Sequence, residues 1–192
     1  MPSTEPQSET TEEAPAQQQT YREKLSRAIG KIAFALSNTL SAGDVATLRR
    51  LDATGALSPA FFRIVAEVLE PAGLLPQGDG LSRDEAEQKW TVIVSAMAKL
   101  EGLHQPGRRL GGAIAEAGMS ELRFERLLRA HDEALHDLIR QTAHYLASKA
   151  SPCDQRELAE LVLSDGHKSS ESIRRNVARN FYRAQRQASA KS

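Results

Sequence analysis

Hydrophobic residues recur at helical spacing through most of this chain, and no stretch shows the period of two that is typical of a β-strand. The first helical stripe follows Tyr21 and consists of Leu25, Ile29, Ile32, Leu36 and Leu40. Because one apolar stripe must be buried against another, a chain with only this pattern packs helix on helix. We therefore expect an all-α protein of about eight helices.

Capping residues indicate where several of these helices begin. Ser41-Ala-Gly-Asp44 and Ser82-Arg-Asp-Glu85 both match a capping box, the first opening a helix over about 44–53 and the second a longer helix through Trp90. Ser58-Pro59 places a cap residue before a proline at the first helical position. The helix after it is expected to bury Phe61, Phe62, Val65, Val68 and Leu69.

The second half of the chain predicts further helices over about 108–117, 120–130, 132–149 and 170–188, and one that follows Ser151-Pro152 and is ended by Asp165-Gly166. The segments 120–130 and 132–149 either form two helices or one continuous helix. His104-Gln-Pro-Gly107 interrupts the helical pattern near the middle of the chain. This break predicts two lobes, an N-terminal helical lobe over 20–105 and a C-terminal helical bundle over 106–192.

Charge is sorted along the chain although the formal net charge is zero. Residues 1–19 contain four acids, no base and almost no apolar side chain, so we expect a disordered acidic tail there. No apolar run is long enough to cross a bilayer, and the N-terminus lacks the basic start and apolar stretch of a signal peptide. With a single cysteine, Cys153, these features predict a cytoplasmic protein that does not contact a membrane.

A row of arginines follows one face of the last predicted helix. It consists of Arg175, Arg179, Arg183 and Arg186, with Arg174 beside it in the sequence. The apolar residues of this helix fall on the opposite face of a helical wheel. The guanidinium group stays charged at physiological pH and can bind phosphate oxygens through two hydrogen bonds. The row therefore indicates either a polyanion partner or a solvated helix face.

Other basic residues extend this candidate nucleic-acid surface. They are the adjacent pairs Arg49 and Arg50 and Arg108 and Arg109, which acids do not immediately neutralise, together with Arg123 and Arg126. Acids nearby in the sequence could pair with Arg126 and Arg129. The aromatic residues Trp90, Phe61, Phe62 and Phe124 sit at core-like positions rather than on a stacking platform. We therefore expect contacts with a sugar-phosphate backbone rather than sequence readout.

No motif for catalysis, metal or cofactor binding is recognisable. His131, His136 and His144 lie five and eight residues apart, whereas a helical zinc pair is separated by four. The glycines in Leu110-Gly111-Gly112 lack the lysine and the preceding strand of a phosphate-binding loop. We expect neither a cofactor nor catalysis. A helical enzyme that uses these histidines is an alternative that would require bound metal.

The order of several short segments resembles the CasB family, the small subunit of the type I-E CRISPR complex called Cascade. These segments are Gly43–Arg50, the Trp90 helix, Arg108–Gly111, Ser120–Arg129, Ile173–Arg175 and Phe181-Tyr182. Together they extend over about residues 21–186. The chain departs from the family after Pro152, where Asp154-Gln155 replaces an aromatic residue next to an aspartate.

The resemblance implies a non-catalytic subunit of a crRNA-guided surveillance complex in antiviral defence. Its expected partners are the backbone and large Cascade subunits, a second copy of itself, the guide-RNA ribonucleoprotein and the displaced single strand of the target DNA. Base pairing with the guide reads sequence in such complexes, and protein contacts stabilise the opened DNA. The alternative is a structural helical adaptor whose arginines pair with acidic partner subunits.

Overall fold

A computed structural model describes residues 13–51, 58–78 and 80–190, with side chains from residue 20 onward. Helices form all of the regular structure in these ranges, apart from an isolated parallel bridge between His104 and Cys153. They are α1 (Glu13–Asn38), α2 (Ala42–Arg49), α3 (Pro59–Ile64), the π-helix η1 (Val65–Leu69), α4 (Leu81–Lys99), α5 (Leu110–Glu116), α6 (Glu121–Arg129), α7 (Asp132–Ser148), α8 (Gln155–Leu163) and α9 (Ser170–Ser189). The prediction of an all-α protein is confirmed.

Two of the predicted helix starts have the expected caps. The hydroxyl of Ser41 accepts a hydrogen bond from the backbone N–H of Asp44 at 3.1 Å and donates one to the Asp44 carboxylate at 2.9 Å. The hydroxyl of Ser58 accepts from the N–H of Phe61 at 3.2 Å, with Pro59 at the first helical position. Because each cap satisfies N–H groups that have no partner inside the helix, these short helices have defined starts.

Two other local predictions are wrong. The helix α4 begins at Leu81 with Gly80 as its N-cap, so Ser82 lies inside the first turn and caps nothing. Gly80 has a φ of 133°, a conformation that glycine adopts without steric cost. Phe62 is also not a core residue, because its side chain is 51% exposed while Phe61 is fully buried.

The segment predicted as one or two helices over 120–149 forms two. The helix α6 ends at Arg129, and α7 starts at Asp132, whose φ is 50°. The backbone N–H of Asp132 donates to Oδ2 of Asp165 at 2.8 Å. This bond to a residue beyond α8 holds the chain in the turn between the two helices.

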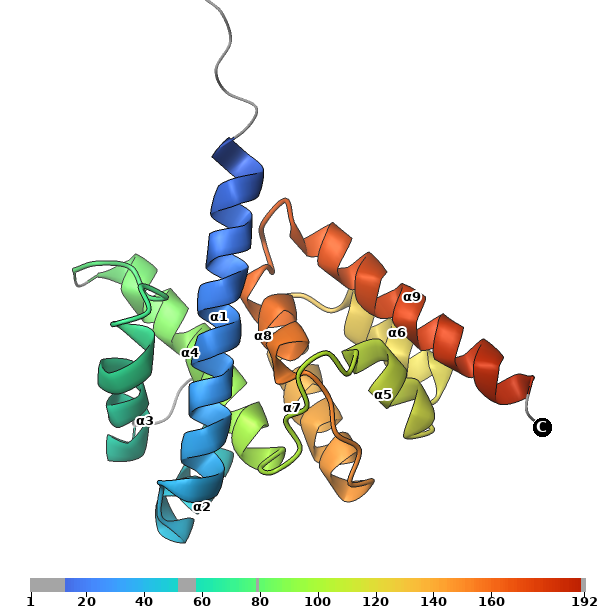
Figure 1. Ribbon diagram of the computed structural model, residues 1–192, viewed down its shortest axis with the longest axis horizontal. Coiled ribbons are helices and arrows are strands. Elements are labelled where there is room, and N and C mark those ends of the chain that lie inside the picture. Colours follow the sequence, from blue (N-terminus) through green and yellow to red (C-terminus); the bar gives the residue numbers. More distant parts are fainter. Residues whose placement is uncertain (1–12, 52–57, 79, 191–192) are drawn as a thin grey trace, which may run out of the picture.

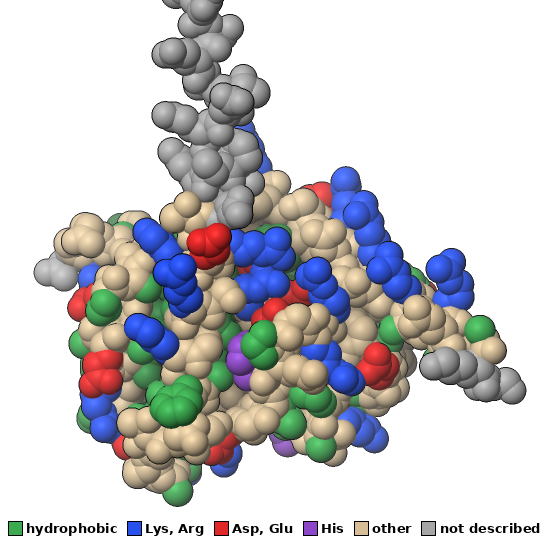
Figure 2. Space-filling view, in the orientation of Figure 1, with side chains coloured by type: hydrophobic (Ala, Val, Ile, Leu, Met, Phe, Trp, Pro, Cys, Tyr) green, Lys and Arg blue, Asp and Glu red, His purple; other side chains and the backbone are tan. Residues whose placement is uncertain are grey.

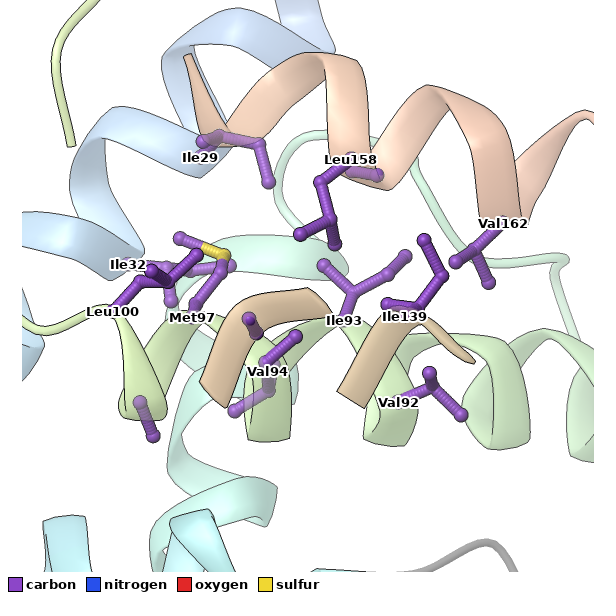
Figure 3. Packing of buried hydrophobic residues seen from close by; sticks show 14 of the residues in the cluster. Ile29, Ile32, Val92, Ile93, Val94, Met97, Leu100, Ile139, Leu158 and Val162 are labelled. Atoms are coloured by element: carbon purple, nitrogen blue, oxygen red, sulfur yellow. The ribbon is translucent and has the colours of Figure 1, made fainter. Parts of the chain in front are cut away.

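The centre of the core is the meeting point of α1, α4, α7 and α8. Figure 3 shows Ile29 of α1, Ile93 and Met97 of α4, Ile139 of α7 and Leu158 of α8 converging there. All five side chains are completely buried. The core-facing sides of these four helices agree with the helical periodicity of the sequence.

The crossing of α5 and α9 depends on a glycine. A Cβ atom at Gly111 would lie 2.1 Å from the carbonyl oxygen of Val177 and 2.9 Å from the backbone nitrogen of Phe181. Such distances are far below a van der Waals contact, so only glycine allows the two helix backbones to come this close. Gly111 therefore determines where the arginine helix α9 lies on the rest of the molecule.

In Figure 1, α1 crosses in front of α4, with α3 on one side and α8 and α9 on the other. One continuous cluster of buried hydrophobic residues includes members from both predicted lobes. The division at residues 105 and 106 stays a prediction. Of the predicted tail, residues 1–12 lie outside the described part, and the backbone of 13–19 forms the first turns of α1. No helix within the described ranges has the length and hydropathy of a membrane span.

Candidate nucleic-acid interface

The predicted arginine row lies on the solvent face of α9. Val177 and Phe181 are buried on one side of the helix, while Arg179, Arg183 and Arg186 are exposed on the other. A hollow of about 470 Å³ lies along this face. Its lining residues are Arg175, Ala178, Arg179, Tyr182, Arg183 and Arg186. Figure 2 shows the basic side chains of α9 projecting in a line from the body of the molecule.

Three arginines of the row have no ion-pair partner among the residues that the structure describes: Arg179, Arg183 and Arg186. Arg175 pairs with Glu171 one turn earlier, at 2.9 Å, but both side chains are 66% exposed. An exposed pair of this kind contributes little stability and exchanges readily for another anion. The row is therefore able to bind phosphate groups along about three turns of α9.

Arg174 is not part of this accessible surface, in contrast to its place in the predicted site. Its side chain is only 8% exposed, and its Nη2 lies 2.7 Å from Oδ1 of the buried Asp165. The guanidinium also donates to the hydroxyl of Ser170 at 3.0 Å and to the carbonyl of Leu128. Arg174 faces the protein because it lies about 100° around the helix from Arg175, toward α6 and the end of α8.

The carboxylate of Asp165 is strongly stabilised in its charged form. Burial alone opposes ionisation, but hydrogen bonds from the Asp132 backbone, from His131 at 2.8 Å and from Arg174 lower the pKa of Asp165 below its ordinary value. A carboxylate that accepts several such bonds binds its cation tightly. Asp165 therefore fixes Arg174 as a structural link between α9, α8 and the turn between α6 and α7.

Arg108 and Arg109 pair with acidic residues that lie 8 and 48 residues further along the chain. Arg109 Nη1 lies 2.7 Å from Glu157 Oε1, and this contact raises the pKa of Arg109. The other oxygen of Glu157 accepts from the backbone N–H of Leu110 at 2.7 Å and so caps the start of α5. Arg108 Nη2 lies 2.6 Å from Glu116. The sequence has no acid immediately beside Arg108 and Arg109, so it did not predict that carboxylates neutralise both arginines.

The remaining predicted arginines differ in their accessibility. Arg49 is bound through Nε to the carbonyl of Ala98 at 2.9 Å and through Nη2 to Glu101 at 2.6 Å. Arg50, Arg123 and Arg126 are exposed, with no ion pair to a described residue. Glu125 pairs with Arg129 at 3.4 Å instead of with Arg126. Arg123 and Arg126 lie on α6, which packs beside α9 through the stacked rings of Phe124 and Phe181.

The sequence interpretation missed a basic face on α1. Lys24, Arg27 and Lys31 recur at helical spacing on the side of α1 opposite the buried Leu25 and Ile29, and all three are exposed. Among the side chains that the structure describes, only Arg27 of these three has an ion-pair partner, Glu23, at 3.9 Å. Figure 2 shows basic side chains over α1 on the same side of the molecule as those of α9. The helical wheel that identified the α9 row could have found this second row.

Among the described residues, no group of three or more His, Cys, Asp or Glu side chains is placed to hold a metal ion. His131 is bound to Asp165, and His104 Nδ1 accepts from the backbone N–H of Gln155 at 3.3 Å. Burial raises the pKa of the Cys153 thiol to about 12, which leaves it protonated at neutral pH. Of the two glycines after Leu110, Gly111 serves helix packing, whereas a Cβ at Gly112 would meet no atom within 4 Å.

Comparison with known proteins agrees with the segments that the sequence analysis singled out. Residues 44–182 match the family model of "CRISPR-associated protein Cse2", which covers most of the chain. The chain belongs to the Cse2 (CasB) family, the small subunits of type I-E Cascade. Among curated proteins, none matches this sequence. Membership in the Cse2 family implies association with other Cascade subunits and is consistent with a non-enzymatic protein.

The fold also agrees with a solved Cse2-family structure. The crystal structure of CasB from Thermobifida fusca superposes with a TM-score of 0.59 at 20% sequence identity. The similarity covers 84% of this chain and 97% of that chain. At this identity the shared feature is the fold, because surface residues change faster than packing.

Proposed function

We propose that this Cse2-family chain is a non-catalytic subunit whose basic surface holds single-stranded nucleic acid by its backbone, without sequence specificity. The surface consists of the α9 row (Arg175, Arg179, Arg183 and Arg186) and the α1 row (Lys24, Arg27 and Lys31). In an assembled cytoplasmic Cascade complex, this surface stabilises the R-loop by holding the displaced DNA strand. A second copy of the chain and the guide-RNA ribonucleoprotein are the further partners.

The observation that carries the proposal is the state of Arg179, Arg183 and Arg186. These arginines are exposed and project from one helix, and none forms an ion pair with a described residue. Arg49, Arg108, Arg109 and Arg174, by contrast, are engaged by acids of the same chain. An exposed arginine with no counter-ion in its own chain binds a phosphate with a larger gain in free energy than an arginine whose ion pair with a carboxylate must first be broken.

The rival function, a structural adaptor, uses the same arginines to bind acidic partner subunits. The two functions predict different results for Arg179→Ala/Arg183→Ala in the assembled complex. A suitable control is Arg63→Ala/Arg129→Ala, which removes two exposed arginines that pair with Asp44 and Glu125. Both variants change the net charge by the same amount.

The readout is the reactivity of the displaced strand toward permanganate, together with the subunit composition of the purified complex. We expect the α9 variant to assemble with all subunits while the displaced strand becomes more reactive, and the control to behave like the unchanged protein. Loss of this chain from the complex, with the strand protected in whatever complex remains, would instead support the adaptor.

A further inference from the structure

A groove beside the α9 row has a different chemical character from the row itself. It lies between α1, α8 and α9 and has a volume of about 710 Å³, within the range of small-molecule sites. Its apolar lining comes from Tyr21, Leu25, Leu163, Ile173 and Val177. Its polar lining includes Arg22, Arg109, Glu157, Glu160, His167, Ser172 and Asn176. The groove thus combines aliphatic and aromatic carbon with several hydrogen-bonding groups.

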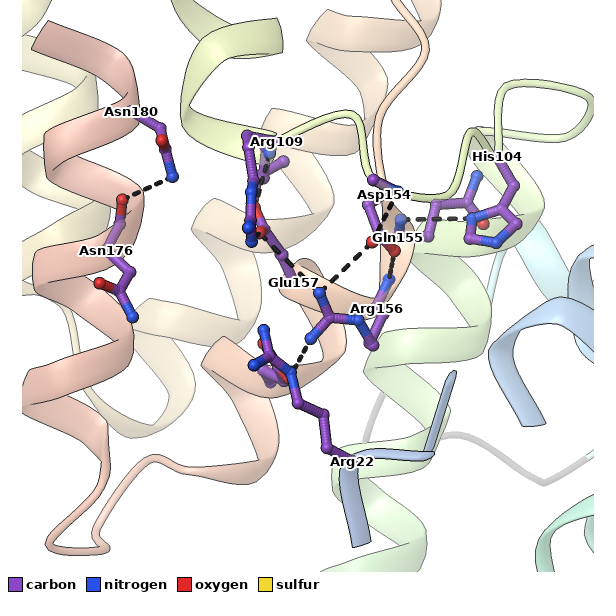
Figure 4. Close-up of polar contacts among 12 residues, drawn as sticks. Arg22, His104, Arg109, Asp154, Gln155, Arg156, Glu157, Asn176 and Asn180 are labelled. Atoms are coloured by element: carbon purple, nitrogen blue, oxygen red, sulfur yellow. Dashed lines mark hydrogen bonds and ion pairs between the residues drawn. The ribbon is translucent and has the colours of Figure 1, made fainter. Parts of the chain in front are cut away.

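The charges in the groove do not favour a phosphate. Arg22 lies 3.3 Å from Glu160, and Arg109 lies 2.7 Å from Glu157, so both arginines already have carboxylate partners. Figure 4 shows these contacts around Arg22, Arg109, Arg156 and Glu157. Arg156 also pairs with Glu160. A dianion or phosphodiester entering the groove would have to displace these carboxylates, whereas a neutral ring would not.

Asn176 supplies a hydrogen-bonding group without a partner. Its backbone carbonyl accepts from the side chain of Asn180 at 2.8 Å, but its own amide has no hydrogen bond to any described residue. It lies on the side of α9 that faces Arg109 across the groove (Figure 4). A side-chain amide carries both a donor and an acceptor, the pair of functions that matches the edge of a nucleobase.

Tyr21 supplies the aromatic wall of the groove. The residue is 46% exposed, and partial burial together with the charge of Glu160 raises the pKa of its hydroxyl. An exposed ring in a partly apolar groove is a stacking surface for a base, and such stacking tolerates any sequence because every base has a π-face. The sequence analysis did not identify this tyrosine as a possible stacking residue.

The groove and the arginine row are neighbours on the same helix. Asn176 and Arg179 are three residues apart, about 4.5 Å along the helix axis, and Ser172 lies one turn before Asn176. A strand whose phosphates lie on Arg179 and Arg183 therefore passes the mouth of the groove. The separation of Asn176 and Arg179 is short enough for one single strand to place a phosphate on Arg179 and a neighbouring base in the groove.

We propose that the groove between α1, α8 and α9 receives a nucleobase from a DNA strand held on α9, with the base stacked on Tyr21 and its edge bonded to Asn176. This inference rests on the proposed function, because it requires a strand on the arginine row. It adds a second contact to backbone binding without introducing a strong sequence preference. The ligand is a neutral heteroaromatic base attached to a phosphate backbone.

The test compares an intact single-stranded oligonucleotide with one of equal length in which consecutive abasic sites replace the central bases. Both carry the same phosphates, so contacts to the arginines are equal, and the unchanged full chain is used. We expect the abasic strand to bind roughly 5- to 150-fold more weakly, the range for loss of one base-aromatic stack. Tyr21→Ala should remove most of this difference between the two strands.

A second arm separates this inference from the proposed function. Asn176→Ala should reduce the difference between intact and abasic strands, while the matched Asn180→Ala, one turn away and outside the groove lining, should preserve it. Arg179→Ala should weaken both strands equally. Equal binding of intact and abasic strands, with dependence on Arg179 retained, would overturn the base site and leave the proposed function standing. Binding of neither strand would overturn both.

Discussion

Arg174 and Asp165 form a buried ion pair at 2.7 Å, with side-chain exposures of 8% and 4%. Its neighbour in the sequence, Arg175, is paired only with an exposed glutamate on its own helix. Two adjacent arginines therefore have different roles. Arg174 holds α9 against the rest of the fold, and Arg175 belongs to the surface that faces solvent.

Replacing Arg174 should destabilise the protein far more than replacing Arg175. Arg174→Ala leaves the buried carboxylate of Asp165 without its main cation, which costs about 3 to 5 kcal/mol in free energy of unfolding. Arg175→Ala removes only an exposed pair and should cost about 0 to 1 kcal/mol. Urea denaturation followed by circular dichroism measures both values. Similar losses for the two variants would contradict the assignment of different roles.

The close contact of α5 with α9 makes Gly111 intolerant of a side chain. Gly111→Ala places a methyl group 2.1 Å from the Val177 carbonyl oxygen, so the helices must separate. We expect a loss of about 1 to 3 kcal/mol, typical of overpacking. Gly112→Ala is the matched control, since a Cβ there meets no atom within 4 Å and alanine favours a helix by about 1 kcal/mol. Equal thermal midpoints for the two variants would show that the helices do not approach this closely.

Asp165 should make the protein less stable in acid. Its pKa is lower in the folded protein than in the unfolded chain, so the unfolded chain binds more protons as the pH falls below about 4. The stabilising contribution of the carboxylate is complete above this pH and is lost as the pH falls through the lowered native pKa. Urea midpoints between pH 2.5 and 6 should therefore fall less steeply for Asp165→Asn than for the unchanged protein. Parallel curves would contradict this.

The Cys153 thiol should be unreactive in the folded protein. It is completely buried, and its pKa of about 12 leaves very little thiolate at pH 8. We expect slow labelling by a thiol reagent in buffer and rapid labelling in concentrated urea, where burial is removed. Rapid labelling of the native chain would show that this part of the core opens.

The helices and the faces of α9 follow from local patterns, which explains why they could be predicted. Val177 and Phe181 are buried and Arg179 and Arg183 exposed because a helix of 3.6 residues per turn separates these positions around its axis. Phe61 and Phe62 show that residue type alone does not predict which side chain is buried. Adjacent residues point about 100° apart on a helix, so a single packed side buries one ring and exposes the other.

The contacts that decide which arginines are available could not be predicted, because they join distant residues. The partner of Arg109 is Glu157, and that of Arg49 is Glu101, separations of 48 and 52 residues. No local spacing rule relates such pairs. The same holds for the groove, where Tyr21 and Asn176 come together only because α1 and α9 both border α8.

The salt dependence of single-stranded DNA binding tests the central claim most directly. For Arg179→Ala/Arg183→Ala, we expect weaker binding at low salt and a slope of log K against log salt that is reduced by about 1.4, or about 0.7 for each lost phosphate contact. Arg63→Ala/Arg129→Ala should keep the slope of the unchanged protein. If the α9 variant retains both the affinity and the slope of the unchanged protein, the arginine row does not bind the DNA backbone.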